Sequence, residues 1–528
     1  MFKTDHKIIL ASVRSISYRS KVVHSGTAHK KWDVKLLANE KKRSEFSKSV
    51  LKRLEQTQFN TTDTGSFWGQ LKEVLTGAAE EAIPPGKMAP MSPITRRAYA
   101  KLQGKINRQK RFPDVERCRT ETVLARSEFE QAKKEHIWRT WRNFFTNLNC
   151  ADPYMWLKKT FEFLKSQKRM KGRNLGRCSI SQFKWLESLY EAVTEGRDIP
   201  LLPESTPPVS FPAPTVGEIR AIIANFRNST SPGSDMINVE LLKKAPDEFV
   251  EKLHELIAVV WNSNVPPADF IDTVQVPIPK KPSPKATTDF RKITLCNVVY
   301  KVIATHLLYK LDEVTGELPT YQAAFLANRS VEDHIFTSKR ITEEYWNHGI
   351  SLYALALDIR QAFDSVSHAA VIKALQTLGV PNFLVNRVIN LALKEKTCLR
   401  WMNQRTPKVN KGKGVKQGRP LSPRLFTLVL HWILLKLKQL HPSVNLEHSV
   451  GMKPPFILAY ADDLMIITSS LKEMDEIMWS HIVGGFHLTS KASVRYLGAY
   501  LTATVNRPES VKRRCSQGSR VSKAILPF

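Results

Sequence analysis

The sequence FILAYADDLMII, residues 456–467, places two adjacent carboxylates, Asp462 and Asp463, between two apolar runs. The apolar runs predict two short strands joined by a tight turn at residues 461–463. Ionised side chains in a dry core are costly unless something neutralises them. The two acids therefore either bind a cation or occupy a solvated turn, and for an isolated Asp-Asp pair we favour the solvated turn.

A third aspartate ends another strand-like run. SLYALALD, residues 351–358, is apolar and terminates in Asp358. Helical patterns alternate with such strands along residues 216–528, which predicts an α+β domain with an antiparallel sheet. If this strand and the Asp-Asp hairpin are neighbours, their carboxylates converge on one point. Converging carboxylates fit Mg²⁺, and two such ions can activate a 3′-hydroxyl and stabilise a leaving pyrophosphate.

The charge of the chain indicates the class of partner. Its 528 residues include 80 Lys and Arg against 49 Asp and Glu, a net charge of +31, with 42% hydrophobic residues. That composition is typical of a globular protein. The positive excess attracts polyanions, of which nucleic acid is the commonest. The alternative is a basic surface that binds nothing.

Cysteine spacing and hydropathy indicate the compartment. The six cysteines lie far apart, with no CxxC and no Cys/His cluster, which argues against a structural zinc site or a disulfide framework. The N-terminus lacks the pattern of a signal peptide, and the longest apolar run, LFTLVLHWILL, is too short to cross a bilayer. We therefore expect an intracellular protein with no membrane partner.

The region over residues 21–200 is basic and largely helical in pattern. Its long basic stretch includes EHIWRTWRNFF, where tryptophans recur among Arg and Lys. Such interleaving can stack on bases and pair with phosphates, so we expect Arg139, Trp141 and Arg142 to contact nucleic acid. Alternatively, the aromatic residues form a core and the charges are solvated. Residues 201–215 hold five prolines and are expected to form a linker.

Three longer motifs change the interpretation of the acids. LALDIRQAFDSV (355–366), GVKQGRPLSPRLF (414–426) and AYADDLMI (459–466) occur in the order of the polymerase motifs of reverse transcriptases. Their wording resembles the enzymes of non-LTR (LINE-type) retrotransposons, and more narrowly the RTE-like branch. The resemblance covers about residues 215–523. It implies a right-hand polymerase, with fingers over 216–350, a palm with an antiparallel sheet over 351–505 and the start of a thumb over 506–528.

The resemblance implies two groups of site residues. The acids that would ligate two Mg²⁺ ions, or Mn²⁺ instead, are Asp358, Asp462 and Asp463. The residues that would bind the nucleotide are Lys280, Arg291, Phe363, Gln417 and Gly418.

Each nucleotide-binding role has a plainer alternative. Phe363 would abut the incoming sugar and exclude a 2′-hydroxyl, but a buried phenylalanine is commonly ordinary core. Gln417 and Gly418 would line the nucleotide and the template base, with the glycine allowing close backbone approach. Arg291 and Lys280 would meet the triphosphate, or they are solvated surface charges.

The pattern departs from the family at several places. Residues 1–20 resemble only the last strand of the endonuclease that precedes this polymerase, so we assign His6 no activity. No Lys-Thr pair lies between Asp463 and Tyr496, and the usual glycine and arginine are replaced by Ala324 and Leu326. Together with the short thumb, these departures suggest a truncated copy.

These observations lead to two hypotheses. The first is an RNA-directed DNA polymerase that uses an RNA template, a DNA primer and dNTPs, with nuclear residence expected from the family's chromosomal priming. The second is a catalytically inactive retrotransposon remnant that still binds nucleic acid. A cellular polymerase such as a maturase fits the motifs less well.

Overall fold

The computed structural model describes residues 32–83, 93–112, 115–146, 199–204, 211–280, 286–446, 454–477, 493–496 and 499–502, apart from residues 327, 360, 402–403, 411, 471 and 475. The predicted endonuclease strand (1–20) and thumb (506–528) lie outside these residues. The chain divides into two compact units. One contains residues 37–82 together with 179–528, and the other contains residues 83–178.

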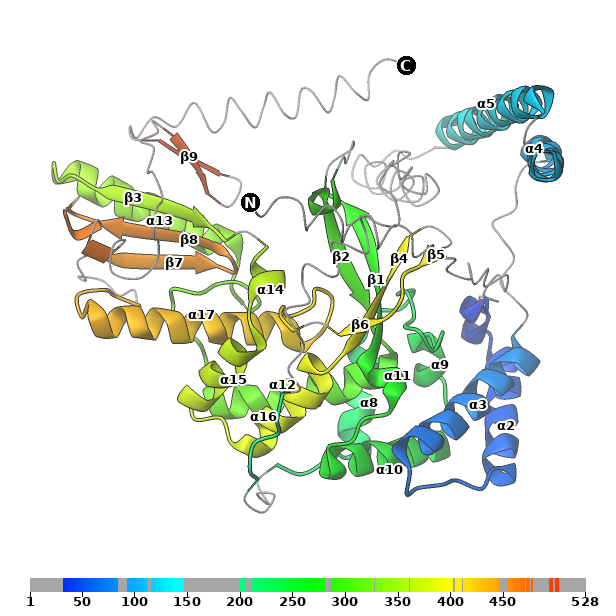
Figure 1. Cartoon of the computed structure of the whole chain (residues 1–528), viewed down its shortest axis with the longest axis horizontal. Coiled ribbons are helices and arrows are strands. Elements are labelled where there is room, and N and C mark those ends of the chain that lie inside the picture. The colour runs from blue at the N-terminus through cyan, green and yellow to red at the C-terminus, as the bar shows by residue number, and fades with distance from the viewer. Residues whose placement is uncertain are drawn as a thin grey trace, which may run out of the picture. The chain divides into compact units, whose positions relative to one another are not determined.

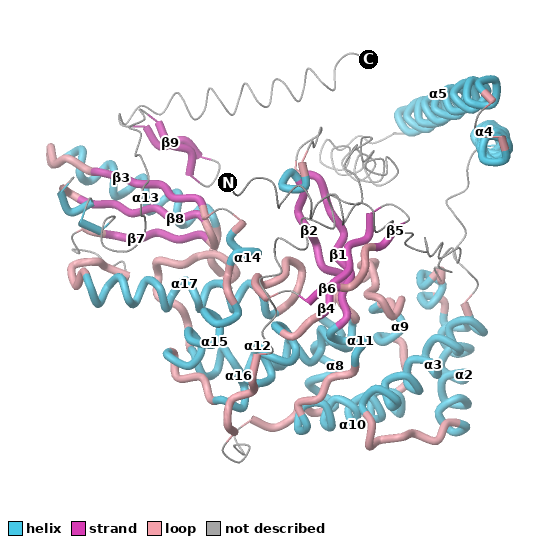
Figure 2. Tube along the Cα trace, in the orientation of Figure 1, coloured by secondary structure: helices cyan, strands magenta, loops and turns pink. Residues whose placement is uncertain are grey.

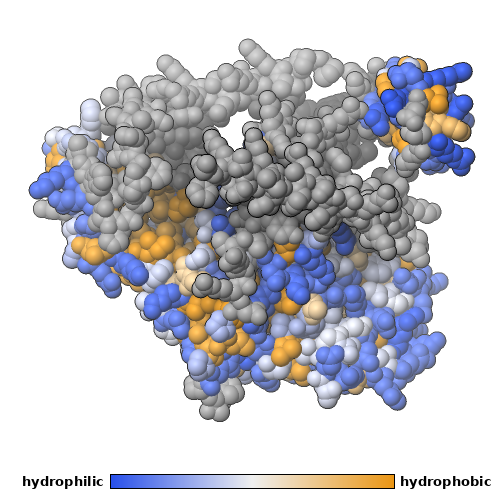
Figure 3. Space-filling view, in the orientation of Figure 1, coloured by the Kyte–Doolittle hydropathy of each residue, from blue (hydrophilic) through white to orange (hydrophobic). Residues whose placement is uncertain are grey.

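The second unit contains a helical hairpin of α4 (Pro93–Arg111) and α5 (Glu116–Thr146). The two helices pack antiparallel, since the Tyr99 and Phe129 rings lie 5.5 Å apart and Lys105 forms an ion pair of 2.7 Å with Glu121. Figure 3 shows hydrophilic and apolar side chains intermixed over this hairpin. The helical pattern expected for this basic stretch is therefore present in residues 93–111 and 116–146.

Leu37 and Ala38, the last residues of the short helix η1 (Val34–Ala38), lead in the first unit into a hairpin of α2 (Glu40–Gln56) and α3 (Thr64–Ala82). This hairpin packs on α10 (Asp247–Ser263). Trp68 is buried with its ring centroid 5.3 Å from that of Phe270, and its indole N–H donates to Asp269 over 3.2 Å. The hairpin therefore belongs to the same unit as the predicted fingers segment (Figure 1).

One sheet of this unit is mixed. Strand β1 (Asp272–Pro279) pairs antiparallel with β2 (Phe290–Leu295) and parallel with β4 (Lys396–Trp401), and β4 also pairs with the short strands β5 (Gln404–Arg405) and β6 (Val409–Asn410). The helices and short turns along this part of the chain are α8 (Val216–Asn225), α9 (Val239–Lys243), α11 (Ala268–Ile271), η2 (Thr287–Asp289), α12 (Val298–Thr315), α16 (Asn382–Val388) and the π-helical turn η3 (Ile389–Leu393).

A second sheet carries the acidic hairpin. Its three strands, in the order β3 (Tyr353–Asp358), β8 (Asp463–Thr468) and β7 (Phe456–Tyr460), are all antiparallel. Phe456, Leu458, Met465 and Ile467 form one buried cluster against Ile341 of α13 (Val331–Asn347). The neighbouring positions on β7 and β8 are buried too, which explains why FILAYADDLMII is apolar on both sides of the turn.

The remaining elements complete an α+β architecture, as the sequence predicted (Figure 2). They are α14 (Ala362–Ser365), α15 (His368–Thr377), α17 (Leu421–Leu440), β9 (Ser493–Tyr496) and β10 (Ala499–Thr502). The long helix α17 runs beneath the β3–β8–β7 sheet in Figure 1.

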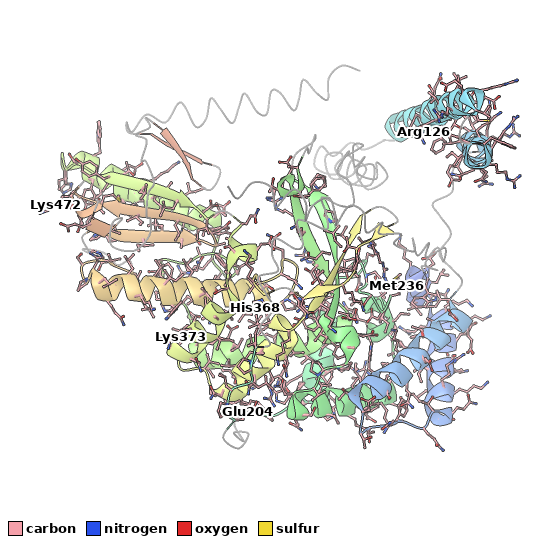
Figure 4. The ribbon with its side chains drawn as sticks, viewed as in Figure 1. Arg126, Glu204, Met236, His368, Lys373 and Lys472 are labelled. Carbon is pink, nitrogen blue, oxygen red and sulfur yellow. The ribbon has the colours of Figure 1, made fainter. Side chains whose placement is uncertain are left out.

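The described parts of the proline-rich stretch are held by the helices of this unit. Asn386 exchanges hydrogen bonds with the backbone of Leu202, at 2.8 and 2.9 Å. Glu204, labelled in Figure 4, accepts from the buried Arg387 over 3.1 Å. Farther along, the indole N–H of Trp261 donates to the Phe211 carbonyl over 3.0 Å. Both ends of the stretch are therefore tied to one folded body.

Candidate active site

The backbone register brings the three acids to one end of the β3–β8–β7 sheet. Asp358 pairs with Asp463 across β3 and β8, and Tyr460 pairs with Asp463 across the β7–β8 hairpin. The turn therefore consists of Ala461 and Asp462 alone. Directly paired residues of antiparallel strands project from the same face, with Cβ atoms about 5 Å apart. Asp358 and Asp463 are thus neighbours on one face, and Asp462 adjoins them in the turn.

The donor chemistry of this corner suits a hard divalent cation. The Asp462 and Asp463 side chains are each partly exposed. Among the described side chains, no group of three His, Cys, Asp or Glu lies close enough to hold a metal ion, and the side chain of Asp358 is outside that set. The fit to Mg²⁺ therefore rests on the register and on the oxygen ligands, which are of the kind that Mg²⁺ prefers.

Phe363 lies in an aromatic cluster at the end of β3. The chain leaves β3 through a left-handed residue, Gln361, and enters α14. The Phe363 ring stacks on Phe426 of α17 at 4.8 Å, and Phe325 meets it edge-on at 6.1 Å. Phe325 is 56% exposed and has a positive φ of 63°, which is unusual for a bulky residue. The sequence did not single out Phe325, because neither its exposure nor its backbone conformation is visible in the motif.

The loop that carries Gln417 and Gly418 is tied to the end of β2. The Thr294 N–H donates to the Gln417 carbonyl over 2.8 Å. Gly418 has a φ of +99°, and a Cβ added there would lie 2.8 Å from the Thr294 carbonyl oxygen. The glycine is therefore required by the close approach of two backbones, and its role beside the nucleotide and the template base stays a prediction.

A buried ionic network, which no sequence motif indicated, fixes both flanks of this loop. Lys416 and Arg419 each form an ion pair with Glu395, and all three residues are buried. Arg419 also donates to the Tyr300 hydroxyl at 3.0 Å and to the Leu391 carbonyl at 2.9 Å. Burial opposes the charge of Arg419, but the Glu395 carboxylate, Tyr300 and Cys296 together outweigh it and raise the pKa of the guanidinium.

The same loop is also connected to the turn after β3. The Val415 N–H donates to the Phe363 carbonyl over 2.7 Å, and the Gly414 N–H donates to the Val366 carbonyl over 2.6 Å. The ring of His368 shares a hydrogen bond of 3.3 Å with the Gly414 carbonyl; this histidine is labelled on α15 in Figure 4. Phe363, Gln417 and Gly418 are therefore parts of one hydrogen-bonded neighbourhood.

Lys280 and Arg291 lie on a different sheet from the three acids. Both are exposed on the β1–β2 hairpin. The Lys280 ammonium donates to the Thr288 carbonyl over 3.1 Å, and its backbone N–H donates to the Asp289 carbonyl over 2.8 Å. Because the two cations and the acidic corner belong to different sheets, the role of Lys280 and Arg291 stays a prediction.

The predicted nucleic-acid residues lie on α5, in the other unit. Arg139 is exposed and forms an ion pair of 2.8 Å with Glu135 one turn away. The side chains of Trp141 and Arg142 are outside the described set. None of the helices in the described ranges is long and apolar enough to cross a membrane.

A comparison with protein families identifies the segment that holds the acidic corner. Residues 278–483 match the family described as reverse transcriptase (RNA-dependent DNA polymerase). The chain contains a reverse transcriptase domain. The matched segment includes all three acids and every residue predicted to bind the nucleotide.

The relatives of this reverse transcriptase domain lie in non-LTR retrotransposons. The Pol polyprotein of the type-1 retrotransposable element R2 of Popillia japonica is 30% identical over 259 residues, which cover 47% of this chain and 34% of that protein. The Pol polyprotein of element R2DM of Drosophila melanogaster is 30% identical, over 46% of this chain and 22% of its own length. An uncharacterized 149 kDa protein of transposon TX1 from Xenopus laevis is 26% identical, over 49% of this chain and 20% of its own length.

The chain thus spans about a third or less of the length of these relatives. Among solved structures, apo telomerase from Candida tropicalis truncated from its C-terminal domain is similar at a TM-score of 0.32 and 12% identity, over 51% of this chain and 67% of that chain. A similarity at this level carries no argument about the site.

Proposed function

We propose that this reverse transcriptase domain catalyses RNA-templated DNA synthesis. The observation that carries the proposal is the register of Asp358 opposite Asp463, with Asp462 in the adjoining turn, inside the segment that matches the family. In this reaction the primer 3′-oxygen bonds to the α-phosphorus of a dNTP. The bond from that phosphorus to pyrophosphate breaks, and the 3′-hydroxyl proton leaves to solvent or a base.

The reaction needs divalent metal, which the reverse transcriptase family uses. We propose that Asp358, Asp462 and Asp463 would hold two Mg²⁺ ions, or Mn²⁺ in their place. When bound, such ions lower the pKa of the 3′-hydroxyl and neutralise the charge of the leaving pyrophosphate. The residues of the chain contribute the oxygen ligands and the fixed geometry of the two-residue turn.

The surrounding residues would bind the nucleotide and the nucleic acids. Phe363 would stand against the sugar, because its ring is held in place by Phe426. Gln417 and Gly418 would line the base pair, because the Thr294 hydrogen bond fixes their backbone. Lys280 and Arg291 would bind the triphosphate, because both side chains are exposed on the β1–β2 hairpin.

The finer assignments are also proposals. The RTE-like branch rests on the wording of the three motifs, and the fingers, palm and thumb boundaries rest on the same resemblance. RNA template and DNA primer are the proposed partners, with α5 adding contacts through Arg139, Trp141 and Arg142. Nuclear residence would follow from a chromosomal primer. A remnant that only binds nucleic acid is not favoured, because all three acids and every residue predicted to bind the nucleotide lie within the matched segment.

The test is incorporation of labelled dTTP on poly(rA)/oligo(dT) with Mg²⁺. Asp462→Asn combined with Asp463→Asn serves as the inactive variant, and Asp247→Asn serves as a matched control, because Asp247 is an exposed acid on α10. We expect Mg²⁺-dependent incorporation by the wild type and by Asp247→Asn, and none by the double variant. Incorporation by the wild type no greater than that of the double variant would reject the polymerase function.

A further inference from the structure

The segment at residues 321–324 forms an additional edge beside the acidic hairpin. The Ala459 N–H donates to the Tyr321 carbonyl over 2.7 Å, and the Ala323 N–H donates to the Ala459 carbonyl over 3.1 Å. Gln322 and Ala459 thus form a parallel bridge. Because Ala459 lies in β7 two residues before the turn, this segment fixes the strand that leads into Asp462.

Tyr321, at the start of this segment, contacts helix α17. The Tyr321 hydroxyl shares a hydrogen bond of 3.1 Å with Nδ1 of His431, and the two rings stack at 5.9 Å. Tyr321 is fully buried. The segment is therefore a fixed support that connects a core helix to the hairpin.

The Gln322 side chain reaches the turn itself. It is fully buried, and its Oε1 accepts hydrogen bonds from the N–H of Ala324 at 2.9 Å and of Ala461 at 3.1 Å. Ala461 is the first turn residue and has a φ of +57°, a left-handed conformation that is disfavoured for alanine. The Gln322 oxygen thus holds the amide of the strained residue that directly precedes Asp462.

Among the described residues, one amide atom of the Gln322 side chain is paired and the other is not. Within the described surroundings, Gln322 Nε2 is buried with no hydrogen-bond partner. An unpaired buried donor costs about 1–3 kcal/mol, whereas a methionine of similar size would leave the Ala324 and Ala461 N–H groups without their acceptor. The glutamine therefore supplies an acceptor to two backbone amides, and the bond to Ala461 connects it directly to the turn that carries the acids.

We propose that Gln322 is a positioning residue, which holds the Ala461 amide and so sets the direction of the Asp462 and Asp463 carboxylates. This inference rests on the proposed function, because it assumes that these carboxylates bind the catalytic metals. Gln322 itself touches neither metal nor substrate.

Two measurements on Gln322→Met in the full chain test the proposal. The first is amide hydrogen exchange of the hairpin peptide, residues 456–467. Loss of one hydrogen bond of about 1–1.5 kcal/mol predicts roughly tenfold faster exchange at Ala461. The second is the Mg²⁺ concentration that gives half-maximal dTTP incorporation, which we expect to rise severalfold.

Gln275→Met is the matched control. Gln275 is also fully buried with one unpaired amide atom, but it lies in β1 of the other sheet. The Gln275→Met variant should leave amide exchange in the peptide 456–467 unchanged. Unchanged exchange in Gln322→Met, or faster exchange spread evenly over the unit including α10, would overturn the proposal.

The two proposals fail in different ways. If the wild type incorporates no dTTP but Gln322→Met still frees the Ala461 amide, the polymerase function fails and the support of the turn by Gln322 stands. If the wild type is active and Gln322→Met keeps both wild-type exchange and the wild-type Mg²⁺ requirement, only the positioning role fails.

Discussion

Substituting Gly418 by alanine should damage the proposed nucleotide site in a way that the structure allows us to estimate. The new Cβ would lie 2.8 Å from the Thr294 carbonyl oxygen and 3.3 Å from Cγ2 of Ile293. The first of these is a backbone atom of β2, which cannot rotate away. The loop must therefore move, and the hydrogen bond from Thr294 to Gln417 lengthens or breaks.

The cost has two parts. A positive φ at an alanine costs about 1–2 kcal/mol. Loss of the Thr294–Gln417 hydrogen bond adds about 1 kcal/mol. If the loop shifts to relieve the contact, a comparable free energy is lost from nucleotide binding. Since 1.4 kcal/mol is a tenfold change, the KM for dNTP should rise about tenfold to a hundredfold.

Gly69→Ala is the matched control for this experiment. Gly69 lies inside α3, and a Cβ added there meets no heavy atom within 4 Å. Alanine in a helix interior is favoured over glycine by about 1 kcal/mol, so this variant should be slightly more stable than the wild type and equally active.

The assay is single-nucleotide primer extension at varied dNTP, with urea unfolding of each variant measured alongside. We expect Gly418→Ala to raise the KM for dNTP about tenfold to a hundredfold and to lower the free energy of unfolding by no more than about 2–3 kcal/mol. A Gly418→Ala protein with the wild-type KM and the wild-type free energy of unfolding would refute the reasoning.

Three further predictions concern buried charges. Glu395→Gln leaves Lys416 and Arg419 buried without a counter-charge, so it should lower the free energy of unfolding by about 3–5 kcal/mol in urea titrations; a loss below about 1 kcal/mol would contradict the network. Arg387→Met removes the side chain that donates to the Trp261, Phe383 and Glu204 oxygens, and should cost a similar amount, with wild-type stability as the contrary result. Burial raises the pKa of Asp235 to about 7, so the unfolded chain loses this proton first and stability falls as pH rises from about 4 to about 7. Asp235→Asn should flatten that part of the stability profile, and an unchanged profile would show that Asp235 is ionised in the folded protein.

The acidic corner could be predicted from the sequence because its signals are local. Alternation of apolar runs around Asp462 and Asp463 predicts a hairpin, and the structure has one, with its turn at residues 461–462. The pairing of β3 with β8 needed one further assumption, that the two strands are neighbours, and the register confirms it. The contact of Gly418 with Thr294 was not predicted, because the sequence indicated a close approach to the nucleotide and not to another strand.

The supports of the site could not be predicted, because they depend on contacts between residues far apart in the chain. The hydrogen bond from Ala461 to Gln322 spans 139 positions, and no local pattern marks it. Glu395 follows a π-helical turn, and the sequence around it is that of an ordinary surface acid. Only the fold shows that it pairs with both Lys416 and Arg419. Proline content predicted a linker at residues 201–215, and its contacts with α16, from Leu202 and Glu204 to Asn386 and Arg387, could not be read from that composition.

The most direct test of the central claim is primer extension on an RNA template of mixed sequence, with each dNTP supplied alone. The wild type should add only the nucleotide complementary to the next template base, should require Mg²⁺ or Mn²⁺, and should lose the activity in Asp358→Asn. Extension that ignores the template base, or that persists in Asp358→Asn, would contradict the account of a templated polymerase built on Asp358, Asp462 and Asp463.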